Sequence, residues 1–186
     1  MSVQTRSQLQ ASAATITNET TAGANTAARV GGLFDDLADT ATLDRERGYA
    51  SILVSGNTTF DTTQNVAVKL EVTMANGILS TYNFSRNAAL STLTYTGTTS
   101  AALKVSANVS FTSANNQRYK WYIAKNNTII PESMADLTMS HSNGHAVYFE
   151  AYLTGAVNDV FSIYVNSVSG DNTITINALN FTAVTL

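Results

Sequence analysis

The chain has 186 residues, of which 44% are apolar and 12% charged, and its formal net charge is −3 with a pI near 5.2. This composition is sufficient for one domain with a buried core and an appendage. The acidic balance lacks the basic face that would replace phosphate counterions, which argues against nucleic acid as a partner. The absence of cysteine excludes disulfides, thiolate metal sites and cysteine nucleophiles.

The N-terminal sequence MSVQTRSQLQASAATITNETT contains no apolar run of signal-peptide length. No stretch of about 18 consecutive apolar residues occurs further along the chain. We therefore expect the protein to be made in a cytoplasm and not to insert into a membrane by itself.

Residues 1–48 form a leader in which apolar and small residues recur from Leu9 at alternating spacings of four and three. This spacing predicts helix, and Gly23 followed by the N-cap candidate Asn25 predicts two helices broken near residues 21–25. The positions predicted to face a partner are Ile16, Ala27, Val30, Phe34 and Leu37. Such a narrow apolar stripe favours self-association or docking to another protein, and the alternative is packing on the chain's own β domain.

From Tyr49 onward the hydrophobic pattern changes to period two, which is typical of strands with one buried face. The segment AALKVSANVSFT, residues 101–112, places on one face Leu103, Val105, Ala107, Val109 and Phe111. The segment NVAVKLEVTM, residues 65–74, alternates in the same way and precedes Asn76-Gly77, the preferred pair for a two-residue hairpin turn.

Further strands are predicted near residues 49–54, 78–84, 92–95, 118–125, 128–139, 145–153, 160–166 and 173–185. In the last of these the apolar residues change phase, which predicts a β-bulge near Ala178. So many short strands predict a mainly β protein in which an antiparallel β-sandwich over residues 49–186 follows the helical leader.

Tyrosines occupy several strand positions that should face water rather than the core. They are Tyr122, Tyr148, Tyr152 and Tyr164. A patch of tyrosines favours a subunit interface, where this residue is enriched. Two alternatives stay open: a stacking platform for sugars, and amphipathic side chains scattered singly on an ordinary surface.

Strand-and-turn phrases follow one another from about residue 57 to the C-terminal end of the sequence. They are TQNVAVKL at 63–70, LTYTG at 93–97, VSANVSFTSANNQ at 105–117, YIAKNNTII at 122–130, NDVFSIYV at 158–165 and NTITINALNFT at 172–182. In this order they resemble the small jelly-roll modules that end many tailed-bacteriophage virion proteins, which are related in architecture to trimeric complement and tumour-necrosis-factor domains. The leader segment ITNETTAGANTAARVGGLFDDLADT looks like the attachment segment of fibres from phages of gut bacteria.

The resemblance implies a homotrimer of jelly rolls whose leader docks to a capsid or tail component of the virion. Two departures from the pattern are Asn127 and Asn158, which stand where related modules often have glycine, and asparagine tolerates the positive φ that such turns require. The expected role is a short head fibre with some adhesion to host surface glycan. The alternative is a tail-fibre receptor-binding protein whose jelly roll recognises host polysaccharide.

The sequence carries no convergent catalytic constellation. His141 and His145 lie in the turn-like stretch SHSNGHAV, and this spacing brings two imidazoles to one side readily only in a helix. The acidic residues are scattered without an evident acid and base pair, at Glu132, Asp136, Glu150, Asp159 and Asp171. We therefore expect no enzymatic activity, no cofactor and no metal site.

Overall fold

In the computed structural model the chain divides into two units, Met1–Glu46 and Arg47–Leu186. The structure describes residues 49–71, 83–87 and 91–186, together with Ala11 and Ala14. Outside these residues lie the break predicted near 21–25, the turn predicted at Asn76-Gly77 and the leader positions predicted to face a partner, which are Ile16, Ala27, Val30, Phe34 and Leu37. The account that follows concerns the second unit.

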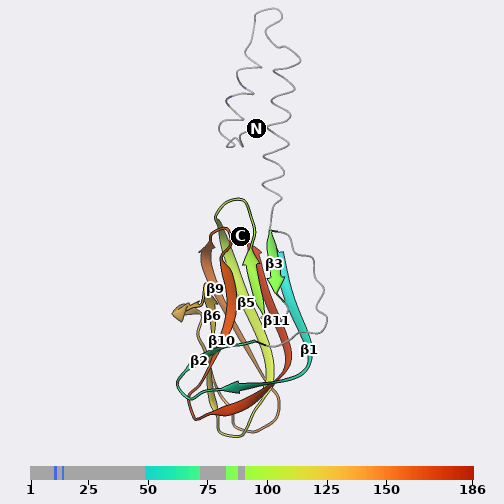
Figure 1. Cartoon of the computed structure of the whole chain (residues 1–186), viewed down its shortest axis with the longest axis vertical. Helices are drawn as coiled ribbons and strands as arrows, with labels where there is room; N and C mark the ends of the chain where they lie inside the picture. The colour runs from blue at the N-terminus through green and yellow to red at the C-terminus, as the bar shows by residue number, and fades with distance from the viewer. Residues whose placement is uncertain (1–10, 12–13, 15–48, 72–82, 88–90) are drawn as a thin grey trace, which may run out of the picture. The chain divides into compact units, whose positions relative to one another are not determined.

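One sheet has four antiparallel strands in the order β1-β11-β5-β9 (Figure 1). Their bounds are β1 Tyr49–Thr62, β5 Ala101–Thr112, β9 His145–Gly155 and β11 Asn172–Thr185. The alternation predicted for β5 is confirmed, because every second residue from Leu103 to Phe111 is buried. The first and last strands of this unit are neighbours, since Tyr49 pairs with Val184.

The second sheet has seven strands in the order β3-β4-β10-β6-β7, with β2 beside β10 and β8 beside β6. Its strand bounds are β2 Ala67–Lys69, β3 Phe84–Asn87, β4 Thr92–Tyr95, β6 Arg118–Lys125, β7 Thr128–Ile129, β8 Ala135–Thr138 and β10 Val160–Ser167. The named strands of this sheet pair antiparallel as well.

The chain crosses repeatedly between the two sheets. β4, β6 and β10 belong to one sheet, whereas β5, β9 and β11, which follow them in turn, belong to the other. The two sheets form a sandwich (Figure 1), and this alternation of strands between its layers is the connectivity of a jelly roll. The predicted antiparallel jelly-roll β-sandwich is therefore confirmed.

Two predicted strands differ from the structure. Residues 128–139 form two short strands separated by a 3₁₀ turn at Pro131–Ser133, because proline has no N–H to donate to a β-ladder. In the segment 65–74, of which residues 65–71 are described, the strand covers Ala67–Lys69 and the side chain of Val66 is 51% exposed. Apolar alternation there does not lead to complete burial.

The predicted irregularities are confirmed. The pairing of β11 with β5 shifts register between Ile176 and Ala178, where the apolar residues change phase. Asn127 and Asn158 adopt φ values of 63° and 71°, in the left-handed region that asparagine tolerates. Asparagine thus supports both turns.

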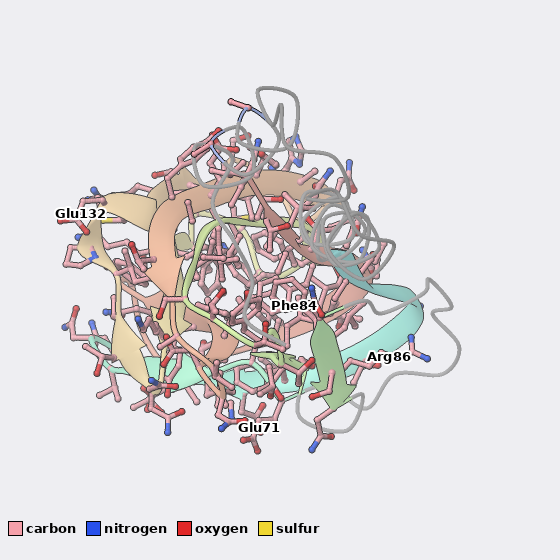
Figure 2. The ribbon with its side chains drawn as sticks, turned by 90° about the horizontal axis from the view of Figure 1, so that it is seen from above. Glu71, Phe84, Arg86 and Glu132 are labelled. Atoms are coloured by element: carbon pink, nitrogen blue, oxygen red, sulfur yellow. The ribbon has the colours of Figure 1, made fainter. Side chains whose placement is uncertain are left out.

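The core lies between the two sheets and is centred on aromatic side chains. Trp121 of β6 is completely buried, and its ring centroid lies 4.9 Å from that of Phe111 and 6.2 Å from that of Phe149. Since Phe111 and Phe149 belong to the four-stranded sheet, Trp121 joins the two layers. Figure 2 shows Phe84 directed to the interior, whereas charged side chains such as Arg86 and Glu132 lie at the rim.

We predict that Trp121→Ala lowers the free energy of unfolding by about 3–5 kcal/mol, because the cavity removes contacts with both sheets. Denaturant unfolding followed by circular dichroism measures the change. The control is Lys120→Ala, at the adjacent outward-facing position, for which we expect a change within about 0.5 kcal/mol. Equal losses in the two variants would contradict the placement of Trp121 as the link between the layers.

Candidate functional site

The four tyrosines predicted to form one patch lie on two different sheets. Tyr148 and Tyr152 are on β9 of the four-stranded sheet, whereas Tyr122 and Tyr164 are on β6 and β10 of the other sheet. Each tyrosine alternates with buried residues that fill the core, so each points away from it. The single patch inferred from the sequence is therefore wrong, and the sandwich carries one tyrosine pair on each outer face.

The pair on the seven-stranded sheet is partly covered by its own domain. Tyr164 and Tyr122 stand directly opposite each other, and the next pair on the same face of these strands is Ser162 and Ala124. That pair faces the same side but is completely buried. The Tyr164 hydroxyl donates a hydrogen bond of 3.4 Å to Asn127 Oδ1, and both Tyr164 and Tyr122 are only partly exposed. Much of this aromatic surface is therefore used within the domain.

Tyr122 is also enclosed by its surroundings. Burial first, and then the negative charge of Asp136, raises the pKa of the Tyr122 phenol. Asp136 itself accepts hydrogen bonds from the Arg118 guanidinium, with 2.8 Å between Arg118 Nε and Asp136 Oδ1. These bonds lower the pKa of Asp136, so the negative charge beside Tyr122 is already paired.

The pair on the four-stranded sheet is much more exposed. The exposed fractions of Tyr148 and Tyr152 are 54% and 62%, and both lie on β9, which ends the order of strands in this sheet. Glu150 lies between them on the same strand face, and Lys104 stands opposite Tyr152 on β5. We call the side chains of Tyr148, Glu150 and Tyr152 the tyrosine ridge.

The negative charge of Glu150 in the tyrosine ridge is paired with the neighbouring Lys104. Lys104 Nζ lies 2.8 Å from Glu150 Oε2, and the Tyr148 hydroxyl donates a hydrogen bond to the same carboxylate. The Lys104 ammonium also lies 5.6 Å from the centroid of the Tyr152 ring, within the range of a cation–π contact. One carboxylate and one ammonium thus hold both aromatic side chains.

The ionisation of both charged groups reflects this arrangement. The hydrogen bond from Lys104, and next that from Tyr148, lowers the pKa of Glu150. The hydrogen bond to Glu150, and next the contact with Tyr152, raises the pKa of Lys104. Both groups therefore stay ionised and paired over a wide pH range.

Beside the ridge, the same face of the sheet carries short polar side chains that hydrogen-bond to one another. Ser106 and Thr182 share a hydrogen bond of 2.7 Å between their hydroxyls, and Ser51 donates one of 3.1 Å to Asn180 Oδ1. These residues lie on β1, β5 and β11, and their short side chains satisfy one another. The face therefore combines exposed tyrosines on β9 with short, hydrogen-bonded polar side chains on the neighbouring strands.

Sequence reasoning found the tyrosines and missed the ion pair. It treated Glu150 as an isolated acid, although the period of two places it on the same face as Tyr148 and Tyr152. The partner Lys104 lies more than forty residues earlier in the chain, on a strand that pairs with β9. No local signal identifies that pairing.

The described part of the chain shows no cluster of three potential metal ligands. Among these residues no three His, Cys, Asp or Glu side chains gather closely enough to hold a metal ion. The same residues include no helix with the length and apolar character of a membrane span. The exposed tyrosine ridge is the candidate functional site in this region.

Comparison with known proteins gives similarities of structure. No protein-family model and no curated protein sequence matches the chain. Among solved structures, the chain is similar to the Eiger TNF of S. frugiperda, with a TM-score of 0.48, 13% identity and coverage of 75% of this chain and 94% of that one. It is also similar to the PRD1 vertex protein P5, with a TM-score of 0.49, 14% identity and coverage of 75% and 96%. For murine APRIL the TM-score is 0.49, the identity 9% and the coverage 75% and 99%.

We predict that Lys104→Met raises the pKa of Glu150 toward or above its ordinary value of 4.5, because the strongest stabilising hydrogen bond is lost. Tyr148→Phe should raise it less, since it removes the weaker bond. Because the folded-state pKa is lowered, this pair stabilises the fold above the unfolded pKa and the effect is lost as pH falls through the folded value. NMR titration of the Glu150 carboxyl measures both changes, and an unaltered pKa in Lys104→Met would contradict the pairing.

Proposed function

We propose that this chain is a structural component of a bacteriophage virion, a short homotrimeric head fibre that is anchored by its N-terminal helices and displays the jelly roll. The observation that carries the proposal is the exposed tyrosine ridge on the four-stranded sheet, with its charges already paired. The phage assignment rests on the resemblance of the sequence to virion jelly-roll modules and fibre attachment segments. Weak adhesion to host surface glycan is a second task of the displayed domain.

The tyrosine ridge has the properties of a surface that another subunit covers. Tyrosine supplies large contact area with little loss of conformational freedom, and it is enriched in interfaces. Burying an unpaired charge in an interface is costly. Lys104 and Glu150 already form an ion pair within one subunit, so covering them leaves neither charge unpaired. Self-association therefore removes apolar ring surface from water without leaving an unpaired ion.

The geometry of the face favours a ring of subunits. The ridge lies on β9, and the hydrogen-bonded side chains of Ser106 and Thr182 lie on β5 and β11 of the same sheet. These are different surfaces of one subunit, so a ridge that packs on the Ser106 and Thr182 surface of a neighbour makes a heterologous contact, which forms a ring when the rotation between subunits closes. The number three comes from the resemblance to trimeric jelly rolls.

A structural role rather than catalysis fits the state of the acidic residues. Glu150 pairs with Lys104, Asp136 with Arg118, and Asp159 with Lys125 at 2.8 Å. Asp159 also accepts hydrogen bonds from the backbone N–H of Ala156 and the side-chain amide of Asn126. These carboxylates hold strands and turns together, which supports a structural role for them.

We predict that the full chain is a trimer in solution and that the double substitution of Tyr148→Ala and Tyr152→Ala shifts it to monomer, because the ridge area is lost. Light scattering coupled to size exclusion measures the mass. Tyr122→Ala is the matched control on the other sheet and should leave the trimer intact. Dissociation by the control alone would place the interface on the other face, and a monomeric wild-type chain would refute the assembly.

We further predict that gold-labelled antibodies against the jelly roll decorate the heads of purified particles of the phage that encodes the chain. Electron microscopy gives the result directly. Label confined to the tail would instead support a tail-fibre receptor-binding protein that recognises host polysaccharide. Particles without label would contradict the assignment to the virion.

A further inference from the structure

The loop between β8 and β9 holds the two histidines of the chain. Met139 is buried, and its N–H donates a 2.7 Å hydrogen bond to the carbonyl of Gln117, which anchors the start of the loop. The residues from Ser140 to Gly144 are exposed, and His145 begins β9 opposite Phe111. The loop is therefore tied to the sandwich at both ends and open to solvent between them.

The fold brings the two imidazoles together although the stretch is not helical. The ring centroids of His141 and His145 lie 4.7 Å apart, with 31° between the ring planes. The sequence spacing predicted this proximity only for a helix. The bends from Ser140 to Asn143 bring the two rings together in a loop instead.

A second contact orients one of these rings. Nε2 of His145 lies 3.2 Å from the backbone carbonyl oxygen of His141. A carbonyl oxygen can only accept a hydrogen bond, so this contact requires the proton on Nε2 and leaves the lone pair on Nδ1. A donated N–H to a carbonyl is the outer contact that commonly holds a metal-binding histidine in its tautomer.

We propose that His141 and His145 together bind one divalent transition-metal ion per chain, Cu²⁺ in preference to Zn²⁺. The ligands are the Nδ1 atom of His145 and an imidazole nitrogen of His141, and water completes the coordination. Both rings border solvent, which leaves the remaining positions open.

The chemistry of the donors decides which ions fit. Imidazole nitrogen suits Cu²⁺, Ni²⁺ and Zn²⁺, and for such a site the affinity follows the order in which Cu²⁺ exceeds the others. Hard ions such as Mg²⁺ need several oxygen ligands, and the two histidines provide none from their rings. The histidine pair should therefore bind transition-metal ions in preference to hard ions such as Mg²⁺.

The test is titration calorimetry of the full chain with CuCl₂, ZnCl₂ and MgCl₂, together with NMR of the imidazole protons of the unaltered chain. We expect one Cu²⁺ site per chain, weaker Zn²⁺ binding and no response to Mg²⁺. Cu²⁺ should broaden the resonances of His141 and His145 before all others. This second measurement requires no substitution, so it is independent of any effect of a variant on folding.

The variants are His141→Ala and His145→Ala, with Ser140→Ala as the control in the same loop. Each histidine variant should weaken Cu²⁺ binding by about 10–100-fold, at least the loss typical of disturbing an outer-shell contact, and the control should bind as the wild type does. The proposal is overturned if only one of the two histidine variants weakens Cu²⁺ binding, or if neither variant does. It is also overturned if Mg²⁺ competes with Cu²⁺ equally well. Because none of these outcomes depends on oligomer mass or virion location, the site is tested separately from the fibre function.

Discussion

The register of β5 between β11 and β9 is the constraint on which both faces of the four-stranded sheet depend. It directs Leu103 and Phe111 into the core and Lys104 and Ser106 to the outside. Because side chains alternate with a period of two, a slip of one residue would reverse every one of them. The burial of aromatic rings against Trp121 of the other sheet opposes such a slip. The same packing that stabilises the core therefore also places Lys104 beside Glu150.

The two outer faces of the sandwich have different characters as a result. On the seven-stranded sheet, Tyr164 is partly buried and hydrogen-bonds to Asn127, and Asp136 is paired with Arg118, so aromatic and charged groups serve the domain itself. On the four-stranded sheet the tyrosine ridge projects to solvent while its charges are paired. The exposed aromatic surface of the described domain is therefore greater on the four-stranded sheet than on the other.

Much of the fold could be predicted because most strands have one buried and one wet face. β4, β6, β9 and β10 begin at the residues predicted from alternation, and the bulge at Ala178 follows from a change of phase. Prediction failed where local and tertiary preferences differ. The apolar run at 128–139 is interrupted at Pro131, and Val66 alternates correctly but remains exposed. The candidate site was predicted only in part, because the tyrosines were found but their distribution over two sheets was not.

The sequence by itself determined which residues face inward along each strand, which turns need asparagine in the left-handed region, and that β sequence follows a leader with helical spacing. These properties depend on the chain within a few residues. Tertiary structure alone decided which strands pair, and so it decided the contact of Lys104 with Glu150 and the division of the tyrosines. It also brought His141 to His145 in a loop. The physical reason is that strand pairing joins residues far apart in the chain, through a backbone pattern that every strand shares.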